Sequence, residues 1–309
     1  MPEIYHLSFI FRRYIFERAA RRAKENGYDG LELFAGHFRL DHLWEDLEDV
    51  RRVSRGVGIP VPAINLHSHV IGDDPEERRR RVAWLSEVIA RLPDYGFRIM
   101  NGFAGALITG PTEFVKQDWG KNGSAAASDA HYERAVEAYR QLAEVARRAG
   151  LLLTLEVHMN TIHDTAATAR RLVDAIDSPA VRANLDAGNM LGVPHAEPAV
   201  EGVGILGHRI AYAHVKNARK APYLTVGIDY NWRLPQGEVD YYAVVAALVH
   251  QGFDGPYTIE WSGTGDPNVA ATEDLRYLKG ILAAVAADDA AEGERARDQK
   301  ALTGAAGPE

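Results

Sequence analysis

Leu151-Leu-Leu-Thr-Leu-Glu156-Val-His158 is the stretch of sequence that decides the fold, and it also points to a functional site. A run of apolar and β-branched residues leads into a carboxylate, and an imidazole follows two positions later. Alternate residues of a strand share a face, so Glu156 and His158 are expected to point the same way. Burying ionisable groups costs free energy unless they are paired or bind a metal, so this strand end predicts a site.

The same pattern, an apolar run that ends in an ionisable residue, recurs three times further along the chain. It appears in Val181-Arg-Ala-Asn-Leu-Asp186, in Ile210-Ala-Tyr-Ala-His214 and in Tyr257-Thr-Ile-Glu260. The spacings are 30, 28 and 46 residues (156 to 186 to 214 to 260), and each holds one strand and one helix, the last with an additional loop.

Predicted strands and helices alternate along the whole chain. Strands are expected at 4–11, 28–34, 59–66, 97–103, 151–158, 181–186, 209–215 and 256–261, and helices at 14–26, 41–56, 74–92, 129–149, 165–176, 197–206, 240–251 and 270–286. This alternation is typical of a parallel sheet wound with helices, and the count predicts a single α/β domain, a (β/α)8 TIM barrel. A doubly wound open sheet is the alternative fold.

Two long loops are expected after the fourth and seventh strands, at 104–128 and 217–238. In a barrel they lie on the face where the strands end, and loops of this length are typically lids or binding loops. The catalytic barrel is predicted to occupy residues 1–286. Residues 287–309 contain few large apolar side chains, which predicts a flexible or peripheral C-terminal tail.

Composition narrows the classes of partner and metal. The formal charge of -8 gives no global electrostatic reason to bind nucleic acid or an anionic membrane. The chain has no cysteine, so a metal would bind through carboxylate, imidazole and water, which favours Mn, Mg, Co or Fe, or a sulfur-free Zn site. No apolar run approaches the roughly 20 residues of a membrane span, and residues 1–5 do not begin a signal peptide, so a cytoplasmic location is expected.

A nucleotide cofactor is not expected. The glycine spacing of the segment Gly202-Val-Gly-Ile-Leu-Gly207 matches the dinucleotide-binding fingerprint. It precedes a predicted strand, however, instead of following a strand into a helix, so the phosphate-binding geometry of that motif is missing.

Strand ends of a closed barrel converge on its axis, so Glu156, Asp186, His214 and Glu260 are expected to meet. Two glutamates, an aspartate and a histidine form a hard, oxygen-rich site suited to an octahedral divalent ion. The alternative is that each residue is a structural strand end, satisfied by the backbone or by an arginine.

The ordered set of motifs resembles the sugar phosphate isomerase/epimerase superfamily of xylose-isomerase-like barrels over nearly the whole chain. The motifs are Gly27-Tyr-Asp-Gly-Leu-Glu-Leu, Leu155-Glu-Val-His158, Asn184-Leu-Asp186, His214-Val-Lys216, Gly237-Glu-Val-Asp240 and Gly252-Phe-Asp-Gly-Pro-Tyr-Thr-Ile-Glu260. The resemblance implies a divalent metal, often manganese, held by the Glu-Asp-His-Glu set. It also implies that Glu156 and Glu260 move protons on opposite faces of a substrate, as in ketose 3-epimerases.

The chemistry of such a site has two outcomes. A metal on a carbonyl polarises the adjacent C–H, and a carboxylate or histidine removes the proton to give an enediolate. If the proton returns to the substrate, the reaction is an isomerisation or epimerisation. A sugar or polyol isomerase or epimerase is therefore the first hypothesis. If a leaving group on the β carbon is lost, the reaction is an elimination and the enzyme is a lyase. The candidates are a cyclitol dehydratase and the catalytic subunit of a C-glycoside deglycosidase acting on a 3-keto-glycoside. A metal-dependent endonuclease and a non-enzymatic binding barrel are the remaining alternatives.

Three positions depart from the familiar epimerases. Asn189 stands where a histidine commonly follows the metal-binding aspartate, Ile162 replaces a frequent glutamate, and Lys220 replaces a frequent arginine. These changes count against ordinary ketose 3-epimerase activity. His158 is then either a catalytic base beside the metal or a group that orients Glu156.

Further residues are candidates for binding a small carbohydrate or glycoside. They lie after predicted strands or in the long loops, and are Glu32, His67, His69, Lys216, Arg219 and Trp119. A homo-oligomer is expected, and the deglycosidase hypothesis adds a small partner subunit.

Overall fold

Eight parallel strands close into a barrel in the computed structural model, which describes residues 1–304. Their order is β1-β10-β7-β6-β5-β4-β3-β2, and β1 pairs with both β10 and β2. The strands are β1 (Ile4–Leu7), β2 (Gly30–Leu33), β3 (Ala63–Asn65), β4 (Ile99–Gly102), β5 (Leu152–Glu156), β6 (Val181–Asp186), β7 (Ile210–Val215) and β10 (Tyr257–Ile259). The closure confirms the predicted TIM barrel and excludes the doubly wound open sheet.

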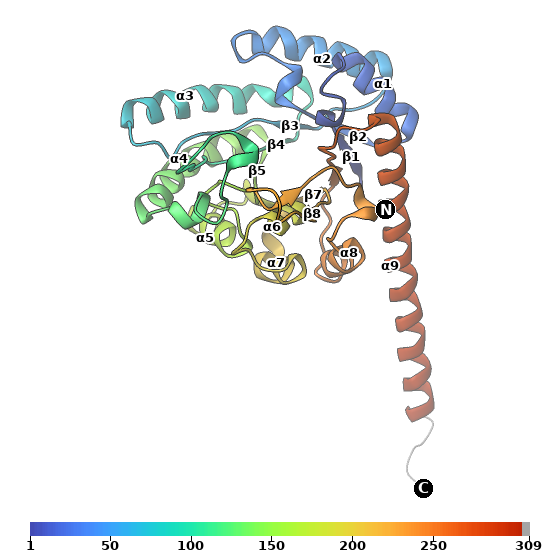
Figure 1. Cartoon of the computed structure of the whole chain (residues 1–309). Coiled ribbons are helices and arrows are strands. Elements are labelled where there is room, and N and C mark those ends of the chain that lie inside the picture. Colours follow the sequence, from blue (N-terminus) through green and yellow to red (C-terminus); the bar gives the residue numbers. More distant parts are fainter. Residues whose placement is uncertain (305–309) are drawn as a thin grey trace.

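Helices surround the barrel (Figure 1). They are α1 (Phe16–Asn26), α2 (Leu43–Val57), α3 (Pro75–Arg91), α4 (Asp129–Ala149), α5 (Ala166–Ile176), α6 (Ala187–Gly192), α7 (Ala199–Leu206), α8 (Tyr241–His250) and α9 (Pro267–Gly304). The boundaries follow local chemistry. Asp74 caps α3 by accepting a hydrogen bond from the Glu76 amide, and α4 ends at Gly150, whose φ of 69° suits glycine. Gly202 and Gly204 lie within α7.

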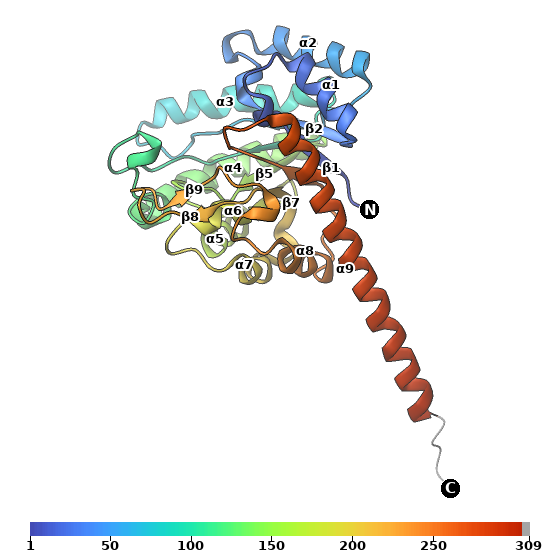
Figure 2. The same cartoon turned by 45° about the vertical axis from the view of Figure 1, so that its right-hand side comes forward.

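The sequence predicts that the last helix ends at Ala286, and this boundary is wrong. α9 continues to Gly304 and extends beyond the barrel in both views (Figures 1 and 2). Alanine, glutamate, arginine and lysine have high helix propensity, which explains the continuation. His250 of α8 pairs with Asp289 of α9 at 2.7 Å, and Tyr242 bonds Asp288. The predicted tail thus begins as a peripheral helix, and its residues 305–309 lie outside the described part of the chain.

Polar residues fill the barrel interior near the strand ends. Tyr5, Ile99 and Tyr212 pack together inside the barrel. Asn101 lies two residues beyond Ile99 on β4, so it shares that inward face and is nearer the C-terminal end. This end of the barrel therefore offers hydrogen-bonding groups instead of a sealed apolar core.

The two long loops contain structure that the sequence does not predict. The loop after β7 carries a short antiparallel hairpin, β8 (Arg219–Lys220) and β9 (Ile228–Asp229). Its base is held by Asn217, whose Nδ2 donates to the carbonyls of Leu234 and Val239. The loop after β4 contains two short 3-10 turns at Phe114–Lys116 and Gly123–Ala126. Among residues 1–304, no helix combines the length and apolarity needed to cross a membrane.

Candidate metal centre

Four ionisable side chains meet at the C-terminal mouth of the barrel, as the sequence predicts. Glu156 and Asp186 are the last residues of β5 and β6, His214 is next to last in β7, and Glu260 follows β10. One ligand atom from each of the four lies within 4.8 Å of the others. In the register of β6 and β7, Asp186 stands directly beside His214.

The distances suit a shared cation. Nδ1 of His214 lies 3.2 Å from a Glu260 oxygen, 3.6 Å from a Glu156 oxygen and 4.0 Å from Oδ2 of Asp186. With metal–oxygen bonds of about 2.1 Å, adjacent ligands of an octahedral ion stand roughly 3 Å apart and opposite ones roughly 4.2 Å apart. The four residues therefore have the spacing of a coordination shell.

Unpaired atoms test whether these residues fit a metal. Among the described residues, Nδ1 of His214 and Oδ2 of Asp186 are both buried and make no hydrogen bond of acceptable geometry, although Oδ2 lies 3.0 Å from Nζ of Lys216. Buried polar atoms are nearly always satisfied, so these two atoms leave room for a further partner. Carboxylate oxygens with one imidazole nitrogen are ligands that Mn²⁺, Mg²⁺ and Zn²⁺ accept, so the residues fit a divalent ion.

Glu32 lies behind this cluster and orients His214. Its carboxylate accepts a hydrogen bond from Nε2 of His214 at 2.7 Å, and further ones from Tyr212 and Asn101 at 2.7 and 3.1 Å. Because Nε2 donates to a carboxylate, Nδ1 of the neutral ring carries its lone pair toward the cluster. Glu32 is fully buried and is not among the residues that line the cavity, so its expected contact with substrate is not supported by its position.

The cluster attracts positive charge. Burial lowers the pKa of His214, but the carboxylates of Glu32 and Glu156 more than offset this and leave the pKa raised. Nζ of Lys216 lies 3.0 Å from Asp186 and 3.1 Å from Glu260, which gives these carboxylates one positive partner. Lys216 and Glu260 both line the cavity, where the expected role of Lys216 in holding a substrate oxygen stays a prediction.

Two amides that the sequence reasoning did not assign to the site hold Glu156. Asn189 donates to one oxygen at 3.0 Å and Asn101 donates to the other at 2.9 Å. Burial still raises the pKa of Glu156 to about 7, with Glu260 and Asp186 adding to the rise while His214 opposes it. Asn101 is next to last in β4, as His214 is in β7, and a polar residue at that place in a strand could have identified it.

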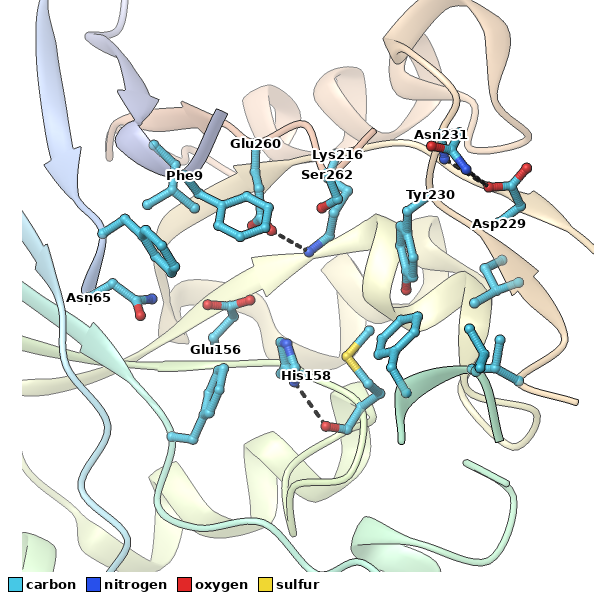
Figure 3. Close-up of a pocket in the computed structure, with 18 of the residues that line it drawn as sticks. Phe9, Asn65, Glu156, His158, Lys216, Asp229, Tyr230, Asn231, Glu260 and Ser262 are labelled. Atoms are coloured by element: carbon cyan, nitrogen blue, oxygen red, sulfur yellow. Dashed lines mark hydrogen bonds and ion pairs between the residues drawn. The ribbon is translucent and has the colours of Figure 1, made fainter. Parts of the chain in front are cut away.

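A cavity of about 520 Å³ opens above the four residues (Figure 3). Glu156, Glu260, Lys216 and His158 line it, and Phe9 and Tyr230 stand on opposite sides in this view. Its volume lies in the range of small-molecule sites. The carboxylates of the candidate centre are therefore accessible to a small ligand.

His158 presents one nitrogen to this cavity. Nδ1 lies 2.8 Å from the carbonyl oxygen of Met159. A carbonyl only accepts hydrogen bonds, so Nδ1 carries the proton and Nε2 of the neutral ring is a free base. Burial lowers the pKa of His158 to about 3, which keeps the ring neutral.

The remaining predicted substrate-binding residues divide into two groups. His67 lines the cavity, and its ring stacks on Phe103 at 4.0 Å, while Phe103 lies 4.2 Å from the ring of His158. Phe103 was not predicted as a site residue, because an aromatic at the end of a predicted strand is typical of a core position.

His69, Arg219 and Trp119 are not in the cavity lining. Arg219 stacks on Trp232 and donates to the Gln236 carbonyl on the outside of the hairpin. Trp119 is 1% exposed and donates to Gln117. Direct substrate contact by these three is therefore not supported by their positions.

Known proteins with similar sequence or structure include sugar epimerases, isomerase-like barrels and a dehydratase. The 3-dehydroshikimate dehydratase of Bacillus anthracis is 24% identical over 220 residues, covering 71% of this chain and 72% of the relative. An L-ribulose 3-epimerase superposes with a TM-score of 0.75 at 18% identity, covering 94% of this chain and 97% of the epimerase.

A third relative has been solved with an ion. A xylose isomerase-like TIM barrel protein from Mycobacterium smegmatis in complex with magnesium has a TM-score of 0.70 at 22% identity, covering 92% of this chain and 97% of that protein. At these identities the structural likenesses establish the fold. The model of the family described as xylose isomerase-like TIM barrel matches residues 20–281, which is most of the chain, and the protein belongs to this family.

Proposed function

We propose that the protein is a divalent-metal-dependent enzyme that removes a proton beside the carbonyl of a polyhydroxylated small molecule. One observation carries this proposal. Glu156 and Glu260 belong to the four-residue cluster that could hold a metal ion, and they also line the cavity. Manganese is the expected ion, with Mg, Co and Zn as alternatives.

The residues have distinct tasks in this reaction. Glu156, Asp186, His214 and Glu260 would hold the ion, which when bound would supply Lewis acidity toward a substrate carbonyl. Nε2 of His158 accepts the proton, since it faces the cavity and is unprotonated. Lys216 holds a substrate oxygen from the side of Glu260.

Elimination is the outcome that we propose first, ahead of the isomerase or epimerase that the sequence alone suggests. His158 provides a base that need not also be a metal ligand, so proton removal does not require a carboxylate of the cluster. The dehydratase relative carries out an elimination according to its name. The substrate would be a keto-sugar or cyclitol, and deglycosylation of a 3-keto-C-glycoside and cyclitol dehydration are the two reactions proposed.

Epimerisation or isomerisation is the second candidate. β5 and β10, which bring Glu156 and Glu260, are separated in the barrel by β6 and β7. The two carboxylates therefore approach the mouth from different sides, which is the arrangement that proton exchange on two faces of a carbon requires. The epimerase structures share this fold.

Metal analysis of three variants tests the proposal. Glu156→Gln and Glu260→Gln remove one charge each from the cluster, whereas Glu133→Gln alters an exposed glutamate of α4. We expect the protein loaded with Mn²⁺ to retain about one ion per chain in the wild type and Glu133→Gln, and to lose it in the other two. Full metal content in both cluster variants would refute the proposed centre.

Exchange in ²H₂O separates the two outcomes. With D-fructose, D-allulose or L-ribulose, reversible proton transfer puts deuterium into recovered ketose. With phenyl 3-keto-β-D-glucoside, elimination releases phenol. Phenol release without ketose labelling supports the lyase, and labelling without release supports the epimerase. If the metal-loaded protein neither releases phenol nor labels the ketose, that outcome contradicts both the lyase and the epimerase.

A further inference from the structure

The cavity has a polar floor and a separate apolar side. The floor carries Glu156, His158, Lys216 and Glu260. The apolar side, here called the loop wall, is built by the loops after β4 and β7 and consists of Phe114, Val115, Leu224, Val226 and Ile228. The metal centre and its hydrogen bonds do not explain why such a wall lies beside a charged floor.

The loop wall presents apolar surface to the outside. Phe114 is 49% exposed and Val115 is 56% exposed, although they are adjacent and both line the cavity. Scattered exposed apolar residues are ordinary on protein surfaces, but neighbouring ones inside a concave site are typical of a binding surface.

An aromatic cluster fixes the wall from behind. The ring centroid of Trp119 lies 5.4 Å from that of Phe114 and 6.3 Å from that of Tyr230, and Phe114 and Tyr230 are 6.5 Å apart. Trp119 is buried and packs in a cluster that includes Val226 and Ile228. Trp119 therefore joins the two loops, so the wall is a packed surface instead of two independent loop tips.

A ligand made only of hydroxyl groups does not complement this wall. The five side chains have no hydrogen-bonding atoms, so hydroxyls set against them would lose water without replacement. A planar ring would bury the exposed faces of Phe114 and Val115 at no such cost, and aromatic pairs gain further from edge or offset contacts.

We propose that the loop wall is a binding subsite for a flat, apolar ring carried by the substrate, whose hydroxylated part lies over the polar floor. The placing of the hydroxylated part rests on the proposed function. The ring subsite itself needs neither the metal nor the base, so it can be tested without them.

Paired ligands that differ only in the ring test this subsite. Phenyl β-D-glucopyranoside and methyl β-D-glucopyranoside are titrated calorimetrically into the full chain, once with Mn²⁺ and once with chelator. We expect the phenyl glucoside to bind at least about tenfold more tightly in both conditions, because only it covers the wall. Phe114→Ala and Val115→Ser should each reduce this advantage to less than about threefold, since both remove apolar surface from the wall.

A matched variant controls for general effects on the loop. Ile108→Ala alters a 38% exposed apolar residue of the same loop that is not in the cavity lining, and it should keep the full advantage. Equal binding of the two glucosides, absence of phenyl glucoside binding, or an unchanged advantage in Phe114→Ala would overturn the subsite. A ring preference in protein that holds no metal and exchanges no protons would sink the proposed function and leave the subsite standing.

Discussion

The carboxylate of Glu32 on β2 accepts a 2.7 Å hydrogen bond from Nε2 of His214 on β7, across 182 residues of sequence. This bond selects the ring tautomer that leaves Nδ1 free to face Glu156, Asp186 and Glu260. Buried carboxylate–imidazole pairs of this kind commonly support metal ligands and raise their basicity. The relationship gives a direct test of how the centre is built.

Glu32→Gln should weaken metal binding while leaving the barrel folded. The amide keeps the shape of the carboxylate but loses its charge, so His214 becomes a poorer ligand. We expect Mn²⁺ affinity to fall by about 10- to 100-fold, measured by titration calorimetry. Glu133→Gln, on the exposed side of α4, should bind as the wild type does. Unchanged affinity in Glu32→Gln would remove the supporting role from this residue.

His158→Asn should separate catalysis from metal binding. The variant removes the free Nε2 without touching the four proposed ligands, so metal content should stay at the wild-type level. Turnover should fall by about 10²- to 10⁴-fold, the usual contribution of a general base. His131→Asn on α4 serves as the control. A loss of metal with His158→Asn would show that this histidine supports Glu156 instead.

Lys216→Met should preserve or strengthen metal binding and reduce turnover. The ammonium lies within 3.1 Å of Asp186 and Glu260, so it repels a cation that shares those carboxylates. Calorimetry with Mn²⁺ measures the first effect and steady-state kinetics the second. Lys24→Met, an exposed change on α1, is the control. Weaker Mn²⁺ binding in Lys216→Met would mean that the ammonium helps to assemble the centre.

Asp274 should make stability depend on pH. It is 1% exposed on α9, accepts a hydrogen bond from the Leu234 amide, and burial raises its pKa to about 7. The unfolded chain ionises this carboxyl near pH 4, so between about pH 4 and 7 the folded state binds more protons. Its contribution to the free energy of unfolding therefore falls as pH rises through that window.

Asp274→Asn should flatten that pH dependence. Urea denaturation at pH 5 and pH 7.5 measures the difference, and Asp254→Asn on an exposed turn is the control. We expect the variant to lose less stability than wild type between these two pH values. An identical loss in both proteins would show that Asp274 is ionised throughout.

Much of the fold and the metal centre follows from local sequence. Glu156, Asp186, His214 and Glu260 each lie at the end of a strand or one residue from it, and closure of a parallel barrel then brings them together without further information. The strand pattern therefore predicts both the architecture and the cluster.

Long-range contacts account for the positions that the local sequence does not predict. Glu32 is next to last in β2, as His214 is in β7, but its partner lies on β7, so its place behind His214 depends on the closed barrel. The sequence places Trp119 in a long loop as a candidate for substrate contact, and only contact between the two long loops buries it. The hairpin β8–β9 has two residues in each strand, which is too short for a periodic pattern.

The division of the cavity between strands and loops has an evolutionary consequence. The four cluster residues are fixed by the barrel, whereas the loop wall stands on segments that can vary in length and composition without altering strand register. Descendants of one ancestor can therefore inherit the same four-residue cluster and differ in the molecules that they bind. Sequence comparisons over the strands would then group such proteins by their cluster residues. Sequence comparisons over residues 104–128 and 217–238 would group them by the ligands that they bind.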